Sequence, residues 1–155
     1  MSEPTSTSQN FMDEALEIAV AAARAGEVPV GAVIVRGGEV IAREGNRTLR
    51  EHDPSAHAEV LAIRTAAKSL NSERLSDCDL YVTLEPCTMC AAAISLARIR
   101  RLYYGAADPK GGAVESGVRF FSSPTCHHKP EVYGGMQEAR AAELLRGFFK
   151  ERRGP

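Results

Sequence analysis

Two short segments contain residue types that can bind a metal ion, His57-Ala58-Glu59 and Pro86-Cys87-Thr88-Met89-Cys90. Cysteines at positions i and i+3 lie on one face of a helix, so both sulfur atoms can reach one ion. Pro86 suits the first turn of such a helix, whose positive dipole end favours the thiolate form that binds metal. With His57, the cysteines supply three ligands for a tetrahedral zinc ion and leave the fourth position open for water. An open position is what a catalytic zinc site requires.

Glu59 is the candidate for proton transfer at this site. It follows His57 by two residues, so on a helix the two side chains point about 200° apart. Glu59 is therefore placed to lie over the water position rather than to ligate the ion. The alternative is a redox or structural CxxC pair beside an unrelated histidine. Structural sites normally close with a fourth Cys or His, and none follows Cys90 at that spacing, so the pattern favours a catalytic centre with one zinc ion per chain.

Length and composition indicate an ordinary globular protein. The 155 residues predict one zinc-binding domain over 10–155, preceded by a Ser/Thr-rich disordered tail over 1–9. The sequence contains no apolar run near the ~20 residues of a membrane span, no signal-peptide pattern and no disulfide framework, which predicts a cytoplasmic protein without a membrane partner. The net charge is −1, so a nucleic acid would have to bind to a local basic patch.

The pattern of apolar residues predicts an α/β fold with three layers, α/β/α, around a mixed sheet of about five strands. A helix is expected from Phe11 to Gly26, and a second one begins near Asp53-Pro54-Ser55 and carries His57. The cysteine motif opens a third helix, and a fourth follows Met136. Strands are expected over 30–35, 39–43, 80–84 and 101–105. Both ligand segments therefore lie at helix starts, where an α/β sheet places its ligand crevice.

The motifs also occur together in a known family. The signature His-x-Glu followed by Pro-Cys-x-x-Cys is that of the zinc nucleobase deaminases. Together with Asn46-Arg47, Asp53-Pro54-Ser55, Val82-Thr83-Leu84-Glu85 and the segment 105–112, it resembles the bacterial tRNA-specific adenosine deaminases over nearly the whole chain, although residues 113–121 differ from many relatives. The resemblance implies a cytidine deaminase-like fold, a homodimer and a tRNA anticodon stem-loop as substrate. The implied reaction is zinc-dependent hydrolysis of the wobble adenosine to inosine and ammonia.

The resemblance also implies roles for individual residues. Water attacks C6 of adenine, and Glu59 takes the water proton and passes it to the ring and the leaving amine. Asn46, which by itself reads as a turn residue beside Gly45, is placed in the base pocket. By the same analogy, the apolar wall of that pocket consists of Val28, Pro29 and Val30, and further substrate contacts come from Asp108 and Lys110.

The C-terminal helix is the main candidate for a contact with RNA. Phe149 turns away from the packed stripe of this helix and lies near Lys150, Arg152 and Arg153. An aromatic ring beside cations can stack unpaired bases and hold phosphates. A basic end that only solubilises the helix is the alternative. Arg47 and the arginines between 98 and 101 add basic surface or serve a subunit interface.

Two other features have weaker interpretations. Glu85 follows a predicted strand, where a glutamate is more often a cap or a surface charge than a second catalytic acid. Cys126-His127-His128 follows Pro124 in a loop without an evident fourth ligand, which favours a loop cluster over a second metal site.

Two other functions compete with RNA deamination. A deaminase of a free base or nucleoside, such as guanine, cytosine or cytidine, would use the same zinc chemistry but has no need of a basic aromatic C-terminal helix. A non-catalytic zinc-binding RNA adaptor would have no need of Glu59. Ammonia release from nucleosides and from an anticodon stem-loop distinguishes the three.

Overall fold

The computed structural model describes residues 6–153, with side chains described for 10–152. Its helices are α1 (Ser6–Arg24), α2 (Ala58–Leu70), α3 (Thr88–Ala97), a short 3-10 turn η1 (Phe120–Ser122) and α4 (Glu138–Arg153). Its strands are β1 (Gly31–Arg36), β2 (Glu39–Gly45), β3 (Cys78–Leu84), β4 (Arg101–Ala106) and β5 (Glu131–Tyr133). They form one sheet in the order β2-β1-β3-β4-β5. β1 runs antiparallel to both of its neighbours, whereas β3, β4 and β5 are parallel, so the predicted mixed sheet is confirmed.

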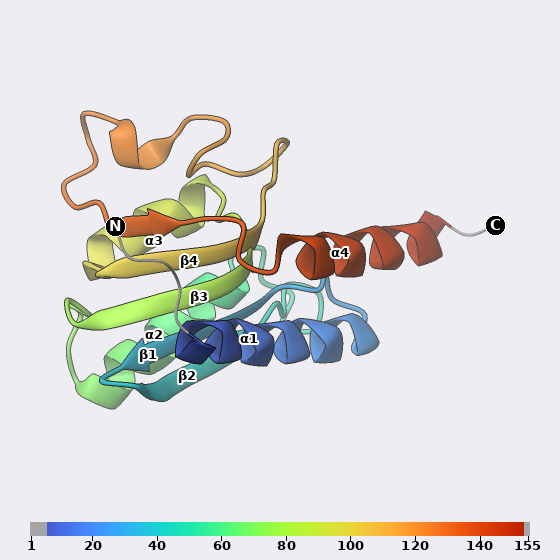
Figure 1. Ribbon diagram of the computed structural model, residues 1–155, viewed down its shortest axis with the longest axis horizontal. Helices are drawn as coiled ribbons and strands as arrows, with labels where there is room; N and C mark the ends of the chain where they lie inside the picture. The colour runs from blue at the N-terminus through green and yellow to red at the C-terminus, as the bar shows by residue number, and fades with distance from the viewer. Residues whose placement is uncertain (1–5, 154–155) are drawn as a thin grey trace.

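Helices cover both faces of this sheet, which confirms the three predicted layers. Figure 1 shows α1 and α4 together on one face, with α2 and α3 behind the strands. Alternate residues of the strands supply the two cores: Ile34 and Leu80 belong to the core beneath α2 and α3, whereas Val33 and Tyr81 belong to the core beneath α1 and α4. This two-residue period is what a sheet buried on both sides requires.

One glycine allows α1 to approach the sheet closely. A Cβ atom at Gly31 would lie 2.0 Å from the carbonyl oxygen of Ala15 and 2.8 Å from the backbone nitrogen of Ala19. Only glycine permits that approach. Because Gly31 opens β1, it also determines how near α1 lies to the end of the sheet at which the candidate ligands gather.

Several element boundaries differ from those predicted. The second helix begins at Ala58 and not near Asp53, because the Asp53 carboxylate accepts a hydrogen bond from the Ser55 N–H and makes a tight turn instead. The third helix begins at Thr88, one residue after Cys87. β5 was not assigned from sequence, since three residues are too few to show a period.

The N-terminal prediction lies partly outside the described residues. The tail was predicted over 1–9, of which 1–5 are not described and Ser6–Gln9 belong to α1. The first helix therefore begins five residues before Phe11. No helix in the described part of the chain is both long enough and apolar enough to cross a membrane.

Candidate metal centre and substrate pocket

His57 and Cys87 each occupy the N-cap position of a helix. His57 precedes α2 and Cys87 precedes α3, both with extended backbone and neither with a side-chain capping bond. Cys90 is then the third residue of α3. The side chains of an N-cap and of the third helical residue approach each other, as they do in a capping box. The two cysteines are therefore neighbours as predicted, although Cys87 lies just outside the helix and not in its first turn.

The three candidate ligand atoms lie close enough to share one ion. His57 Nδ1 is 3.6 Å from Cys87 Sγ and 3.5 Å from Cys90 Sγ. For a tetrahedral zinc ion with usual bond lengths, a nitrogen and a sulfur ligand are separated by about 3.5 Å. All three atoms lie within 4.8 Å of one another. The two nitrogen–sulfur separations therefore fit a zinc ion.

The ionisation of the two thiols also fits a cation. A hydrogen bond from Cys90, assisted by His57, lowers the pKa of the Cys87 thiol to about 4. The same contact with Cys87, together with burial, raises the pKa of the Cys90 thiol. A second thiolate is thus disfavoured beside the first one. A bound divalent cation removes this conflict, because its charge deprotonates a coordinating thiol outright.

Glu59 is enclosed at the bottom of the same site. Its residue surface is 4% exposed, and burial raises the pKa of its carboxyl to about 7. It lines a cavity of about 330 Å³ together with His57 and Cys87. A carboxyl group that titrates near neutral pH is suited to accept a proton and to release it again.

Asn46 also lines this cavity. Its side-chain oxygen accepts a hydrogen bond of 2.8 Å from the N–H of Ala58, the first residue of α2. That bond orients the amide and leaves its NH₂ group as the donor that can meet a bound molecule. Val28 and Val30 also line the cavity, whereas Pro29 is buried and is not among the lining residues. Sequence reasoning did not identify three further lining residues, namely Thr48, Leu84 and Gly111.

A second cavity of about 470 Å³ adjoins the first and shares Val28, Leu84 and Asp108 with it. Lys110 and Phe149 also line it, so the chain brings three predicted RNA contacts from two segments to one place. Phe149 is 43% exposed, as predicted from the stripe of α4. Arg152 instead lies over the ring of Phe148 and donates to the Gly26 carbonyl, at 2.6 Å. The side chain of Arg153 lies outside the described residues.

Two buried carboxylates hold loops that border the first cavity, and sequence reasoning missed both roles. Glu27, 0% exposed, accepts hydrogen bonds from the backbone N–H groups of Leu49 and Arg50. Glu85 is 2% exposed, so its interpretation as a surface charge is wrong. Burial opposes ionisation of Glu85, but hydrogen bonds from the backbone hold the pKa of its carboxyl below the ordinary value. No local sequence pattern indicates these two roles, because the hydrogen-bond partners of both carboxylates lie more than twenty residues away.

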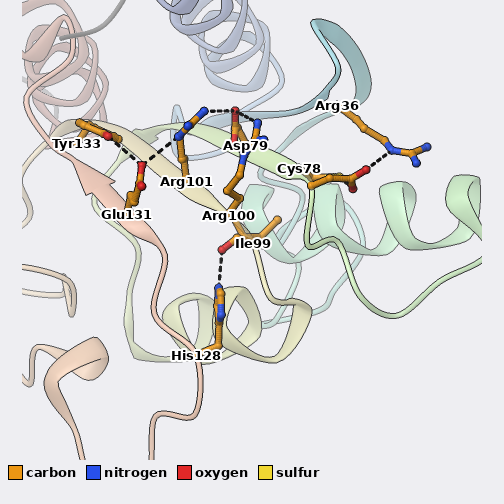
Figure 2. A network of polar contacts seen from close by, with 10 residues as sticks. Arg36, Cys78, Asp79, Ile99, Arg100, Arg101, His128, Glu131 and Tyr133 are labelled. Atoms are coloured by element: carbon orange, nitrogen blue, oxygen red, sulfur yellow. Dashed lines mark hydrogen bonds and ion pairs between the residues drawn. The ribbon is translucent and has the colours of Figure 1, made fainter. Parts of the chain in front are cut away.

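The other candidate residues lie away from this cavity, and their side chains contact other groups of the protein. His128 Nε2 is 2.7 Å from the Ile99 carbonyl oxygen, and Cys126 Sγ is 3.1 Å from the His128 carbonyl oxygen, which supports a loop cluster. Figure 2 shows this histidine below the ends of β3 and β4, where Arg100 and Arg101 pair with Asp79. Those arginines lie at the end of the sheet opposite the candidate ligands.

Known proteins share both the fold and the motifs. The family of the cytidine and deoxycytidylate deaminase zinc-binding region matches residues 5–106. The tRNA-specific adenosine deaminase of Agrobacterium fabrum is 65% identical over 144 residues, which cover 93% of this chain and 95% of that protein. A solved structure from work on A-to-I editing by tRNA:A34 deaminases at the wobble position of transfer RNA is 65% identical, with a TM-score of 0.87 over 88% of this chain and 99% of the other.

A solved guanine deaminase from Bacillus subtilis is more distant, at 34% identity and a TM-score of 0.63, with 95% of this chain and 94% of the other covered. These likenesses confirm the predicted cytidine deaminase-like fold. Identity to the tRNA-specific enzyme is nearly twice that to the guanine deaminase, and this chain belongs to the tRNA-specific adenosine deaminase family of zinc-dependent deaminases.

Proposed function

We propose that this chain hydrolyses the wobble adenosine of a tRNA anticodon to inosine and releases ammonia. The observation that carries the proposal is the enclosed Glu59 carboxyl beside an open three-ligand cluster in one cavity. A cavity of about 330 Å³ lies at the lower end of small-molecule pockets, so it suits one flipped base and not a folded stem-loop. The family to which the chain belongs supports tRNA as the source of that base.

His57, Cys87 and Cys90 are the proposed ligands of one zinc ion per chain. When bound there, zinc supplies a Lewis acid that turns water into a nucleophile near neutral pH. The two N-cap positions hold His57 and Cys87 in extended backbone, so both side chains project from the ends of their helices. The open side of the ligand set then faces the cavity that Glu59 and Asn46 also line.

Glu59 is the proposed proton carrier. Addition of water to C6 of the purine transfers one water proton to the Glu59 carboxylate, which delivers it to the neighbouring ring nitrogen. Glu59 then takes the second proton from the new C6 hydroxyl and delivers it to the leaving amine. The C6–N bond breaks as ammonia leaves and inosine remains. Because Glu59 is buried, bulk water does not compete for these protons.

Asn46 is proposed to orient the base. Its oxygen is engaged by the Ala58 N–H, so its NH₂ group is the part that can donate to a ring nitrogen. Val28 and Val30 supply apolar contact to the flat faces of the ring. We place Pro29 behind this wall, where it shapes the backbone of its neighbours.

The second cavity is proposed to accept the RNA around the flipped base. Phe149 offers an exposed ring for stacking, and Lys110 and Asp108 offer polar groups near the backbone of the RNA. Arg152 and Arg153 add positive charge at the end of α4. Arg152 does so while its guanidinium donates a hydrogen bond to the Gly26 carbonyl oxygen. A groove of this kind serves a polymeric substrate and is not needed for a free base.

The enzyme is further proposed to act as a cytoplasmic homodimer. Met89 and Leu96, seven residues apart on α3, are 38% and 75% exposed and share one face of the helix. Such an apolar pair beside the ligand Cys90 suits a second copy better than it suits solvent. Four free cysteines agree with a reducing compartment. Sedimentation of wild-type protein and a Leu96→Glu variant tests the dimer, which fails if both are monomeric at micromolar concentration.

Ammonia release decides the substrate. The zinc-loaded protein is incubated with an anticodon stem-loop containing a wobble adenosine, with adenosine, with cytidine and with guanine, and Glu59→Ala serves as the background. Deamination of the stem-loop alone is expected. Turnover of guanine or cytidine without turnover of the stem-loop would replace the proposal by a free-base or nucleoside deaminase, and RNA binding without any turnover would favour an adaptor.

A further inference from the structure

Glu85 links the metal-bearing turn to a distant loop. It follows the last residue of β3 and precedes Cys87 by two positions. Its backbone N–H donates to the Ala106 carbonyl oxygen at the end of β4, at 2.8 Å. Glu85 borders the cavity, yet its side chain is buried and its carboxylate is turned to the residues that follow β4. That side chain therefore acts on the protein itself.

The carboxylate of Glu85 accepts five hydrogen bonds from a single loop. Oε2 accepts three, from the consecutive backbone N–H groups of Val114, Glu115 and Ser116, at 3.0, 2.9 and 2.8 Å. Oε1 accepts two, from the backbone N–H of Asp108 at 3.0 Å and from the Ser116 hydroxyl at 2.8 Å. Successive N–H groups that converge on one oxygen form a nest, which favours an anionic acceptor. The carboxylate is thus the centre about which residues 108–116 are folded.

The same loop forms one wall of the substrate cavity. Asp108 and Gly111 line that cavity, and Asp108 Oδ1 accepts hydrogen bonds from the backbone N–H groups of Lys110 and Gly111, at 3.2 and 3.0 Å. Gly112 lets the loop lie directly on Glu85, because a Cβ atom there would be 2.5 Å from the Glu85 side-chain carboxyl carbon. The wall that meets a substrate is therefore positioned by a carboxylate whose two oxygens both accept hydrogen bonds from the loop.

We infer that Glu85 is a positioning residue that sets RNA affinity by holding the 108–116 loop against the metal-bearing turn. The inference rests on the proposed function, since it assigns the loop to the RNA side of that site. Glu85 neither ligates the ion nor moves a proton. Its loss would leave zinc and Glu59 in place and would loosen the wall formed by Asp108 and Gly111.

Glu85→Gln is the sharpest perturbation, because it keeps the shape of the side chain and replaces one acceptor oxygen by an NH₂ group that cannot accept. In the zinc-loaded variant, the amides of 108 and 114–116 are expected to exchange hydrogen at least about tenfold faster than in the wild type. The KM for the stem-loop is expected to rise about tenfold or more, the effect of about 1.4 kcal/mol, while kcat falls less than about threefold. Zinc content should remain at one per chain.

Two further variants make the test specific. Gly112→Ala pushes the loop from the carboxylate without altering Glu85, so it should reproduce the faster exchange and the higher KM even if Glu85→Gln folds poorly. Asp79→Asn is the matched control, because Asp79 is a buried acid at the opposite end of β3 that accepts two hydrogen bonds from Arg100. In that control, exchange of the 108–116 amides and KM should stay within about twofold of the wild type.

Three results would overturn the inference. The first is wild-type exchange and KM in both Glu85→Gln and Gly112→Ala. The second is loss of zinc in step with the loss of affinity, which would make Glu85 a support for the metal turn. The third is an equal effect of Asp79→Asn, which would reduce the role to general stability. The exchange measurement needs no RNA, so it decides the role of Glu85 even if the stem-loop proves not to be the substrate.

Discussion

Replacement of Phe149 by alanine separates base stacking from phosphate binding. The ring is 43% exposed, lines the second cavity beside Lys110 and touches Phe148 edge to face, at 5.4 Å between centroids. An exposed ring contributes little to folding, so the unfolding free energy should change by less than about 1 kcal/mol. The effect on RNA should be larger, since stacking one base on an aromatic ring contributes about 1–3 kcal/mol. That range corresponds to about 5-fold to 150-fold weaker binding.

The salt dependence distinguishes this contact from a charged one. Phe149 is neutral, so Phe149→Ala should weaken binding equally at low and high salt. Lys110→Ala removes a cation from the same cavity, so it should lower the salt slope by about 0.7, the value for one phosphate contact of a single strand. Arg36→Ala is the matched control, because Arg36 is an exposed cation paired with Asp77 at the opposite end of β1. In that control, the affinity for the stem-loop and the salt slope should both stay close to those of the parent protein.

The assay is fluorescence anisotropy of a labelled anticodon stem-loop with the zinc-loaded Glu59→Ala protein, which binds without turnover, at two salt concentrations. Zinc content and melting temperature serve as checks on each variant. If Phe149→Ala binds within twofold of its parent, the ring is not a stacking platform. If Lys110→Ala and Arg36→Ala change the slope equally, the effect of Lys110 is one of overall charge and not of contact.

Four other substitutions test the metal centre and the base pocket. Glu59→Ala should retain one zinc per chain but lower turnover of the stem-loop by about 10²–10⁴-fold, because proton transfer is lost; comparable turnover would refute its role. Cys87→Ala or Cys90→Ala should lose the ion and some thermal stability, since two ligands bind zinc poorly; elemental analysis that finds one zinc per chain in both would show a wrong ligand set. Asn46→Asp keeps the oxygen that meets the Ala58 N–H but removes the NH₂ donors, so kcat/KM should fall about tenfold with an unchanged melting temperature. An unchanged kcat/KM would place Asn46 outside base recognition.

The chemistry of the site can be predicted from short segments of the sequence. The two-residue offset of Glu59 from His57 and the spacing of Cys87 and Cys90 are local features, and each lies within fewer than six consecutive residues. The order of helical and strand segments along the chain likewise predicts a mixed sheet with helices on both faces. The fold class and the candidate zinc centre are therefore predictable from the sequence.

The pocket around that centre, in contrast, depends on contacts between distant segments of the chain. The sequence suggests a cap or a surface charge for Glu85 and no role for Glu27, whereas packing brings N–H groups more than twenty residues away to both carboxylates. Phe149 and Lys110 likewise meet in one cavity although they lie on separate elements. Such contacts join distant segments and are determined by how helices and strands pack, for which spacing along the chain contains no signal. The physical difference is one of range: short-range geometry follows from residue types, whereas long-range contacts follow from the fold as a whole.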